Sequence, residues 1–186
     1  MIRKLNLEDA KVIYKKYMEN DFPDDEVPSY NHYIELIENN KSTPYLYEEE
    51  NEMKAYIICV EKGDFVLISH LAVLKEYRGQ GIGTKLLDEM KSFYRDKQAV
   101  ILEAEAEEQA KDEKALETIK RRQKFYIKCG FIPYPNIDYE LTGVKYLIFV
   151  YSNLKNKIEA EKLMEVIKKL YSGVLKDSKI LKMKVK

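Results

Sequence analysis

The sequence has few of the features that place a protein outside the cell or in a membrane. Its 186 residues include two cysteines, Cys59 and Cys129, which are too few for a disulfide framework and lack the spacing of metal ligands. No apolar run approaches the ~20 residues of a membrane-spanning helix. Residues 1–6 contain no apolar signal segment. These absences favour a cytoplasmic protein that holds no metal and contacts no membrane.

An excess of charge of one sign is also lacking, because 32 basic residues balance 32 acidic ones. The acidic residues nevertheless cluster at three places: Asp21, Asp24, Asp25 and Glu26; Glu48 to Glu50; and Glu103, Glu105, Glu107 and Glu108. A cleft lined by carboxylates attracts cationic amines, although many such clusters are solvated surfaces. The C-terminal tail is rich in lysine: Lys168, Lys169, Lys176, Lys179, Lys182, Lys184 and Lys186. Without interleaved arginines and aromatics, this tail favours a solvated surface over nucleic-acid binding.

Hydrophobic periodicity predicts a single α/β unit without repeats or linkers. The expected strands are residues 1–6, 44–48, 53–61, 65–73, 99–106, 146–151 and an edge strand at 180–185. The expected helices are residues 7–20, 30–39, 84–95, one ending at 128, and 154–171. In the helix at 84–95 we expect Leu86, Leu87, Met90 and Phe93 to face the interior. We expect residues 1–153 to form the core domain and 154–186 to pack on it as an amphipathic helix and short tail.

The most informative segment is a glycine-rich turn between a buried strand and a helix. Gly79, Gly81 and Gly83 occupy three of five positions, which allows a tight turn that directs several amides to one point. Free amides at the start of a helix bind anions such as phosphates. Thr84 stands where a dinucleotide-binding G-x-G-x-x-G motif requires glycine, and the Gly-Lys step of a P-loop is absent. A plain tight turn remains the alternative.

The flanking residues connect this turn to a known family. Arg78-x-x-Gly81-x-Gly83, after a strand that ends in Leu71-Ala72-Val73, resembles the acetyl-CoA-binding motif of the GNAT N-acetyltransferase superfamily. The segment at 125–131, Phe-Tyr-Ile-Lys-Cys-Gly-Phe, is similar to the Tyr-x-x-x-Gly-Phe segment of that family. The resemblance implies an α/β (α+β) fold with a mixed sheet that splays between its fourth and fifth strands, residues 65–73 and 99–106. Helices would flank this sheet, and the C-terminal helix would be an addition to the family fold.

The resemblance also implies a binding site for the co-substrate acetyl-CoA. Its pyrophosphate is expected on the amides from Gly79 to Gly83, and its pantetheine arm is expected to pair with backbone near Ala72. The full set of expected acetyl-CoA-binding residues is Leu71, Ala72, Val73, Arg78, Gly79, Gln80, Gly81, Ile82, Gly83 and Thr84.

Two candidate catalytic residues follow from the same comparison. Tyr126 corresponds to the family tyrosine that protonates the leaving thiolate, although packing is the alternative role. Leu102-Glu103-Ala104 is similar to a Leu-Glu-Val pattern in relatives that acetylate protein N-termini, which makes Glu103 the candidate base. By alternation Glu105 shares a face with Glu103, and mutual repulsion would raise a pKa. We assign Glu105 to substrate binding, and it is equally open that both carboxylates only bind a cationic substrate or lie at the open edge of the sheet.

The implied activity is transfer of an acetyl group from acetyl-CoA to a primary amine. The acidic clusters favour a small cationic amine or polyamine as acceptor. A protein N-terminus or peptide is the alternative acceptor, and an acetyl-CoA sensor without catalysis is the alternative function. The amphipathic C-terminal helix leaves a homodimer open. His70 is expected to be a hydrogen-bonded interior residue rather than a proton relay.

Overall fold

The computed structural model describes residues 1–23, 26–154, 157–176 and 180–186. Asp24 and Asp25 of the first acidic cluster and Lys179 of the tail lie outside the described residues. So do residues 155 and 156 of the expected C-terminal helix.

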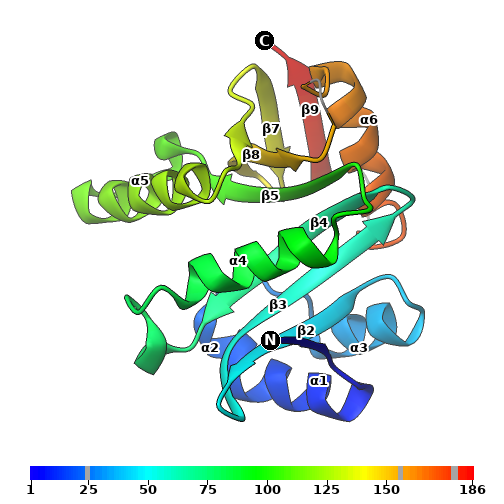
Figure 1. Ribbon diagram of the computed structural model, residues 1–186. Helices are drawn as coiled ribbons and strands as arrows, with labels where there is room; N and C mark the ends of the chain where they lie inside the picture. Colours follow the sequence, from blue (N-terminus) through cyan, green and yellow to red (C-terminus); the bar gives the residue numbers. More distant parts are fainter. Residues whose placement is uncertain (24–25, 155–156, 177–179) are drawn as a thin grey trace. The chain divides into compact units, whose positions relative to one another are not determined.

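The described parts of the chain form nine strands and six α-helices (Figure 1). The strands are β1 Ile2–Lys4, β2 Thr43–Glu49, β3 Glu52–Lys62, β4 Phe65–Val73, β5 Ala99–Glu105, β6 Ile132–Pro133, β7 Ile137–Leu141, β8 Val144–Ser152 and β9 Leu181–Val185. The helices are α1 Leu7–Ile13, α2 Glu19–Asp21, α3 Tyr30–Glu38, α4 Ile82–Phe93, α5 Glu113–Lys128 and α6 Ala160–Tyr171. A π-helical turn, Tyr14–Met18, joins α1 to α2.

The strands form a mixed sheet in the order β1-β2-β3-β4-β5-β8-β7-β9, and β6 pairs with β8. The pairs β1–β2, β2–β3, β5–β8, β7–β8 and β7–β9 are antiparallel, whereas β4–β5 is parallel. This confirms the expected fold class and the edge strand near the C-terminus.

The chain divides into two compact units. Unit 1 comprises Met1–Glu61 and Ser69–Met90, and unit 2 comprises Lys62–Ile68 and Lys91–Lys186.

In unit 1 the first helices pack on strands β2 and β3. One buried cluster joins side chains of α1 and the residues before it, the π-helical turn, α3, β2, β3 and the end of β4: Leu5, Ala10, Ile13, Tyr14, Met18, Tyr33, Leu46, Tyr56, Ile58, Ala72 and Leu74. The Asn6 side chain caps α1 by accepting the Asp9 amide. Strands β2 and β3 are joined by Glu50 and Asn51, with φ of 54° and 63°. Two consecutive left-handed residues between paired strands form a type I′ turn, as a tight hairpin requires.

In unit 2 the pair β5–β8 carries one helix on each face. Register places Leu102 opposite Phe149 and Glu103 opposite Ile148, and directly opposed residues share a face. The Tyr126 ring of α5 lies 5.5 Å from the Phe149 ring, so α5 covers the Leu102 face. Tyr171 of α6 bonds to Glu103, so α6 covers the other face.

The parallel ladder between β4 and β5 is short. It pairs Phe65–Ile68 with Ala99–Leu102 and ends there, although both strands run on. Glu103 is therefore the first residue of β5 after the ladder ends.

Three expectations about elements need correction. Phe93 is 55% exposed, and its neighbour Tyr94 is buried in its place, because Leu86, Met90 and Tyr94 follow one another at i+4 spacing along one stripe. The last helix begins at Ala160 rather than 154. Strands β6 and β7 were not predicted.

Candidate functional site

The glycine-rich turn in unit 1 has the backbone conformation that its sequence predicts. Gly79 and Gly81 have φ of +79° and +80°, in the left-handed region that L side chains rarely adopt. A Cβ atom built on either residue would meet nothing within 4 Å. Glycine is thus required here by conformation, and the space beside the turn is open for a ligand to approach the backbone.

Helix α4 begins directly at this turn. The amides of Thr84 and Lys85 both donate to the Gly81 carbonyl oxygen, at 3.1 Å each. The amides of Ile82 and Gly83 precede the first intrahelical bonds and have no acceptor within the helix. Gly79, Gln80 and Gly81 are exposed. The open space, the amides and the helix dipole together fit the pyrophosphate of acetyl-CoA.

Arg78 anchors the start of this turn. Its Nε donates to the Val73 carbonyl at 2.8 Å, and its guanidinium pairs with Asp21 Oδ1 at 2.9 Å. The other Asp21 oxygen accepts a hydrogen bond from Tyr56 at 3.0 Å. Asp21, which the sequence suggested only as part of an acidic cluster, therefore positions the turn through Arg78. A direct contact from Arg78 to a phosphate stays a prediction.

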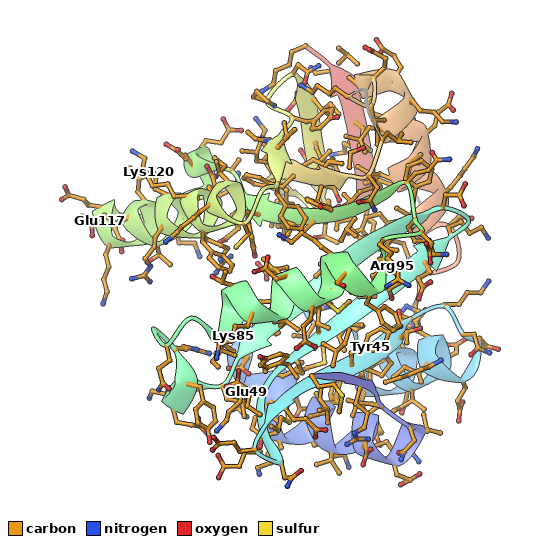
Figure 2. All side chains as sticks on the ribbon, in the orientation of Figure 1. Tyr45, Glu49, Lys85, Arg95, Glu117 and Lys120 are labelled. Carbon is orange, nitrogen blue, oxygen red and sulfur yellow. The ribbon has the colours of Figure 1, made fainter. Side chains whose placement is uncertain are left out.

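Lys85 adds a positive charge to the first turn of α4. Its Nζ lies 2.7 Å from Glu49 Oε1 of β2, and the two side chains point toward one another (Figure 2). Lys85 was not predicted as a site residue, although a lysine within four residues of Gly81 is a signal for anion binding.

The end of β4 leads into the turn. Ala72 is buried, and Leu71 and Val73 are partly buried. Upstream, the ring nitrogens of His70 lie 3.1 Å from the Ser69 hydroxyl and 3.1 Å from the Glu26 carbonyl. Burial lowers the pKa of His70, which agrees with a hydrogen-bonded interior residue. Pairing of the pantetheine arm with this strand end stays a prediction.

In unit 2 the candidate base lies in a three-residue group that we call the Glu103 cluster: Glu103, Tyr139 and Tyr171. Tyr139 of β7 donates to Glu103 Oε1, and Tyr171 of α6 donates to Oε2, each at 2.7 Å. Burial raises the pKa of Glu103 to about 7, and the two hydrogen bonds oppose this rise by favouring the carboxylate. A carboxyl group that titrates near neutrality is suited to proton transfer.

Glu105 has different surroundings from Glu103. Its carboxylate lies 3.3 Å from Arg122 of α5, and its carbonyl accepts a hydrogen bond from Gln123. The expected repulsion between the two carboxylates is not what raises the pKa of Glu103; burial is. The substrate-binding role assigned to Glu105 stays a prediction.

Tyr126 is 8% exposed and packs among aromatic rings of unit 2. Its ring lies 5.5 Å from Phe149 and 6.5 Å from Phe131. Because Phe149 is on the α5 face and Glu103 points to the α6 face, the structure does not bring the candidate acid and base together on one face. At Glu103, β5 is still paired with β8, whereas its ladder to β4 has already ended.

A pocket of about 220 Å³ lies beside the Glu103 cluster, within unit 2. Its lining includes Tyr139 and Tyr146, together with the charged residues Glu107, Glu108, Asp138, Lys145 and Lys186. Tyr139 thus both lines this pocket and bonds to Glu103. No sequence pattern predicts this pocket, because its walls come from five separate segments.

Several residues of the acidic clusters are paired with cations in the part of the chain that the structure describes. The ion pairs within 4 Å include Asp21–Arg78, Glu49–Lys85, Glu105–Arg122, Glu107–Lys120, Glu108–Lys145, Asp138–Lys184 and Glu140–Lys182. Two lysines of the tail are therefore neutralised by carboxylates of β7. This pairing weakens the expectation that the acidic clusters present bare carboxylates to a cationic amine.

No group of three or more potential metal ligands occurs among the residues that the structure describes. Within the same residues no helix is long and apolar enough to cross a membrane. Neither Cys59 nor Cys129 forms a disulfide bond, and both are buried.

Comparison with known proteins decides the family. A sequence model described as "Acetyltransferase (GNAT) domain" matches residues 40–133, half of the chain. The chain belongs to the GNAT acetyltransferase family. The matched region contains the turn, Glu103 and Tyr126, and GNAT acetyltransferases take their acyl group from acetyl-CoA.

Individual relatives agree with this assignment. N-alpha-acetyltransferase 30 of Schizosaccharomyces pombe is 37% identical over 90 residues, which are 44% of this chain and 51% of that protein. The match thus spans about half the length of that relative. A GNAT acetyltransferase structure from Bacteroides thetaiotaomicron has a TM-score of 0.73 at 22% identity, covering 92% of this chain and 96% of the other. Spermidine N-acetyltransferase from Vibrio cholerae, described as dodecameric, has a TM-score of 0.59 at 12% identity, covering 82% and 93%. Both structures show the fold that this chain shares.

Proposed function

We propose that this GNAT acetyltransferase transfers the acetyl group of acetyl-CoA to the N-terminal α-amine of a peptide or protein. The observation that carries this proposal is Glu103, a carboxyl group held by two phenols with its pKa raised by burial to about 7. The pKa of the base selects the kind of amine that it can deprotonate.

An α-ammonium group has a pKa of ~8, whereas an alkylammonium such as that of lysine has a pKa of ~10.4. Transfer of a proton to a carboxylate with a pKa of about 7 is then uphill by roughly one unit for the α-amine. For the alkylamine it is uphill by more than three units, or roughly 5 kcal/mol. Glu103 is matched to an α-amine and poorly matched to a polyamine.

The comparisons support the same acceptor. The relative with 37% identity is named an N-alpha-acetyltransferase, and Leu102-Glu103-Ala104 is similar to the segment that carries the base in enzymes acting on protein N-termini. The spermidine enzyme is 12% identical, so its likeness speaks for the fold alone.

Each residue of the site has its own role in acetyl transfer. The amides of Gly79 to Gly83 bind the pyrophosphate, and the acetyl thioester supplies an electrophilic carbonyl. Glu103 accepts a proton from the α-ammonium group, so that the neutral nitrogen attacks the carbonyl carbon. Tyr126 gives a proton to the departing sulfur. As the C–S bond breaks, the attacking nitrogen releases its second proton to solvent, which leaves the acetylated amine and CoA. Glu103 then gives its proton to solvent, and Tyr126 regains one from solvent.

A small cationic amine is the second candidate acceptor. The three acidic clusters of the sequence favour it, because carboxylates raise the local concentration of polyamines. The ion pairs that occupy most of the described clusters argue against it.

Acetylation of matched acceptors tests the proposal. The acceptors are a short peptide with a free N-terminus, the same peptide with its N-terminus blocked and one internal lysine, and spermidine. We expect CoA release with the free peptide, and mass spectrometry should place the acetyl group on the α-nitrogen. Acetylation of spermidine together with inert peptides would instead identify a polyamine enzyme.

Tyr126→Phe addresses the sensor alternative. An enzyme should lose turnover, by roughly 100-fold or more for a lost general acid, while its affinity for CoA is kept. A sensor binds acetyl-CoA and shows no turnover with any acceptor, in the wild type or the variant.

A further inference from the structure

The Glu103 cluster joins three elements that are distant in sequence. Tyr139 lies 36 residues after Glu103, on β7, and Tyr171 lies 68 residues after it, on α6 (Figure 1). Neither tyrosine falls within residues 40–133, the segment that matches the family. The partners of the candidate base thus come from the C-terminal part of the chain.

The two phenols hold the carboxyl group at both oxygens. Each donates one hydrogen bond of 2.7 Å to a different oxygen, a length typical of a strong bond to a charged acceptor. The two donors come from different elements, Tyr139 from β7 and Tyr171 from α6. Together they fix the rotation of the carboxyl group about its terminal C–C bond. Each oxygen still has a second lone pair with which to accept a substrate proton.

The phenols themselves do not titrate near neutrality. Burial raises the pKa of Tyr139 and of Tyr171 well above 10, and the adjacent Glu103 raises both further. They therefore remain donors throughout the pH range in which Glu103 gains and loses its proton. This leaves one titrating group and two fixed donors in the cluster.

We propose that Tyr139 and Tyr171 are positioning residues that hold the Glu103 carboxyl group in its reactive orientation. Helix α6, which carries Tyr171, then contributes to catalysis. This rests on the proposed role of Glu103 as base. Removal of either hydroxyl takes away a hydrogen bond to the carboxylate form, and the carboxyl group becomes a base only at higher pH.

Other ionisable groups near the cluster leave this expectation unchanged. Tyr139 and Tyr171 face Glu103 from β7 and α6, and Tyr146 of β8 lies with its ring 6.0 Å from that of Tyr139. On β5 itself, Glu105 is paired with Arg122. On β9, the lysines at 182 and 184 are paired with Glu140 and Asp138 of β7.

The experiment compares Tyr139→Phe, Tyr171→Phe and a matched control, Tyr134→Phe. The Tyr134 hydroxyl is also buried, and it donates to the Ile158 carbonyl just before α6 at 2.9 Å, away from Glu103. In each variant the pH dependence of kcat/KM is measured with the free peptide. We expect the acidic limb to move up by roughly one unit in Tyr139→Phe and Tyr171→Phe, and to stay in place in Tyr134→Phe. Recovery of kcat/KM at high pH in the same preparation shows that the variant is folded.

A second readout does not need turnover. Infrared titration follows the protonated carboxyl band of Glu103, which is identified by its loss in Glu103→Gln. This band should titrate at higher pH in the two cluster variants than in the wild type or in Tyr134→Phe. A band and an acidic limb that are unmoved in both cluster variants overturn the positioning role, and so does an equal shift in the control.

Glu103→Gln separates this inference from the function on which it rests. An inactive Glu103→Gln together with unshifted cluster variants keeps Glu103 as the base and removes the role of the tyrosines. Full activity of Glu103→Gln removes Glu103 as the base, and the positioning role falls with it.

Discussion

At the scale of single residues, the turn before α4 depends on two glycines for their conformation. Gly81 has φ of +80° and accepts the first hydrogen bonds of α4 at its carbonyl. Nothing lies within 4 Å of a Cβ placed there. A side chain at position 81 therefore strains the backbone that directs the amides to the ligand, without meeting any atom of the protein.

Gly81→Ala should lower the free energy of unfolding by about 1–2 kcal/mol, the cost of a left-handed L residue. It should also weaken CoA binding by roughly tenfold, because relief of the strain turns the amides away. Gly63→Ala is the matched control, since Gly63 has φ of +56° and equally open surroundings in the turn between β3 and β4. Thermal unfolding and calorimetric titration with CoA test both. Equal CoA affinity in the two variants would show that the turn at Gly81 does not bind CoA.

Some residues of the site can be predicted from the sequence, and others cannot. The turn was predictable because the glycines that form it are within five residues of one another. Glu103 was identified as a candidate base, but its two phenol partners were not. Tyr139 and Tyr171 are two of 15 tyrosines, and only the pairing of β7 and the packing of α6 bring them to β5.

At the scale of elements, the N-cap of helix α5 lies at the opposite end of the helix from the candidate acid, Tyr126. The Asp112 side chain accepts the Ala115 amide at 2.7 Å, and Tyr126 lies near the other end of the helix. Asp112→Ala leaves this amide without its acceptor and should cost about 1 kcal/mol of stability. Asp112→Asn retains an acceptor and should cost much less. Urea unfolding measures both, and kcat should be unchanged in both; a large fall in kcat would show that the cap also positions Tyr126.

Strands β2 to β5 were predictable because turn residues separate apolar runs, and the left-handed pair Glu50–Asn51 forms the expected hairpin. Strand β7, Ile137–Leu141, was not predicted, although its sequence, Ile-Asp-Tyr-Glu-Leu, alternates apolar and polar residues as a half-buried strand does. Strand β6 has two residues and too little pattern for any prediction. The start of α6 was set too early because Ile158, which is buried before the helix begins, fits the helical period.

At the scale of the whole molecule, the proposed functions fall on different units. The turn that would hold the pyrophosphate belongs to unit 1, and the residues that would move protons belong to unit 2. Unit 2 also carries the C-terminal elements α6 and β9, which lie outside the segment that matches the family model. The C-terminal part of the chain is therefore tied both to the stability of unit 2 and to its candidate base.

This link predicts how stability depends on pH. Glu103 titrates at about 7 in the native state, against an ordinary value of 4.5 in the unfolded chain. Between these values the native state binds the proton more tightly, so the stability that this group contributes is complete below about pH 4.5 and is lost as the pH rises through about 7. The loss amounts to about 3 kcal/mol. The Glu103→Gln variant has no carboxyl group to titrate at this position, so its free energy of unfolding should not decline in this way.

Urea unfolding of the wild type and of Glu103→Gln at pH 5 and pH 8 isolates the effect, because all other titrating groups cancel in the difference between the two proteins. The wild type should lose roughly 2–3 kcal/mol relative to the variant between these pH values. A difference that does not change with pH would mean that the carboxyl group titrates at its ordinary value. In that case the pKa match with an α-amine disappears, and the choice of acceptor loses its main support.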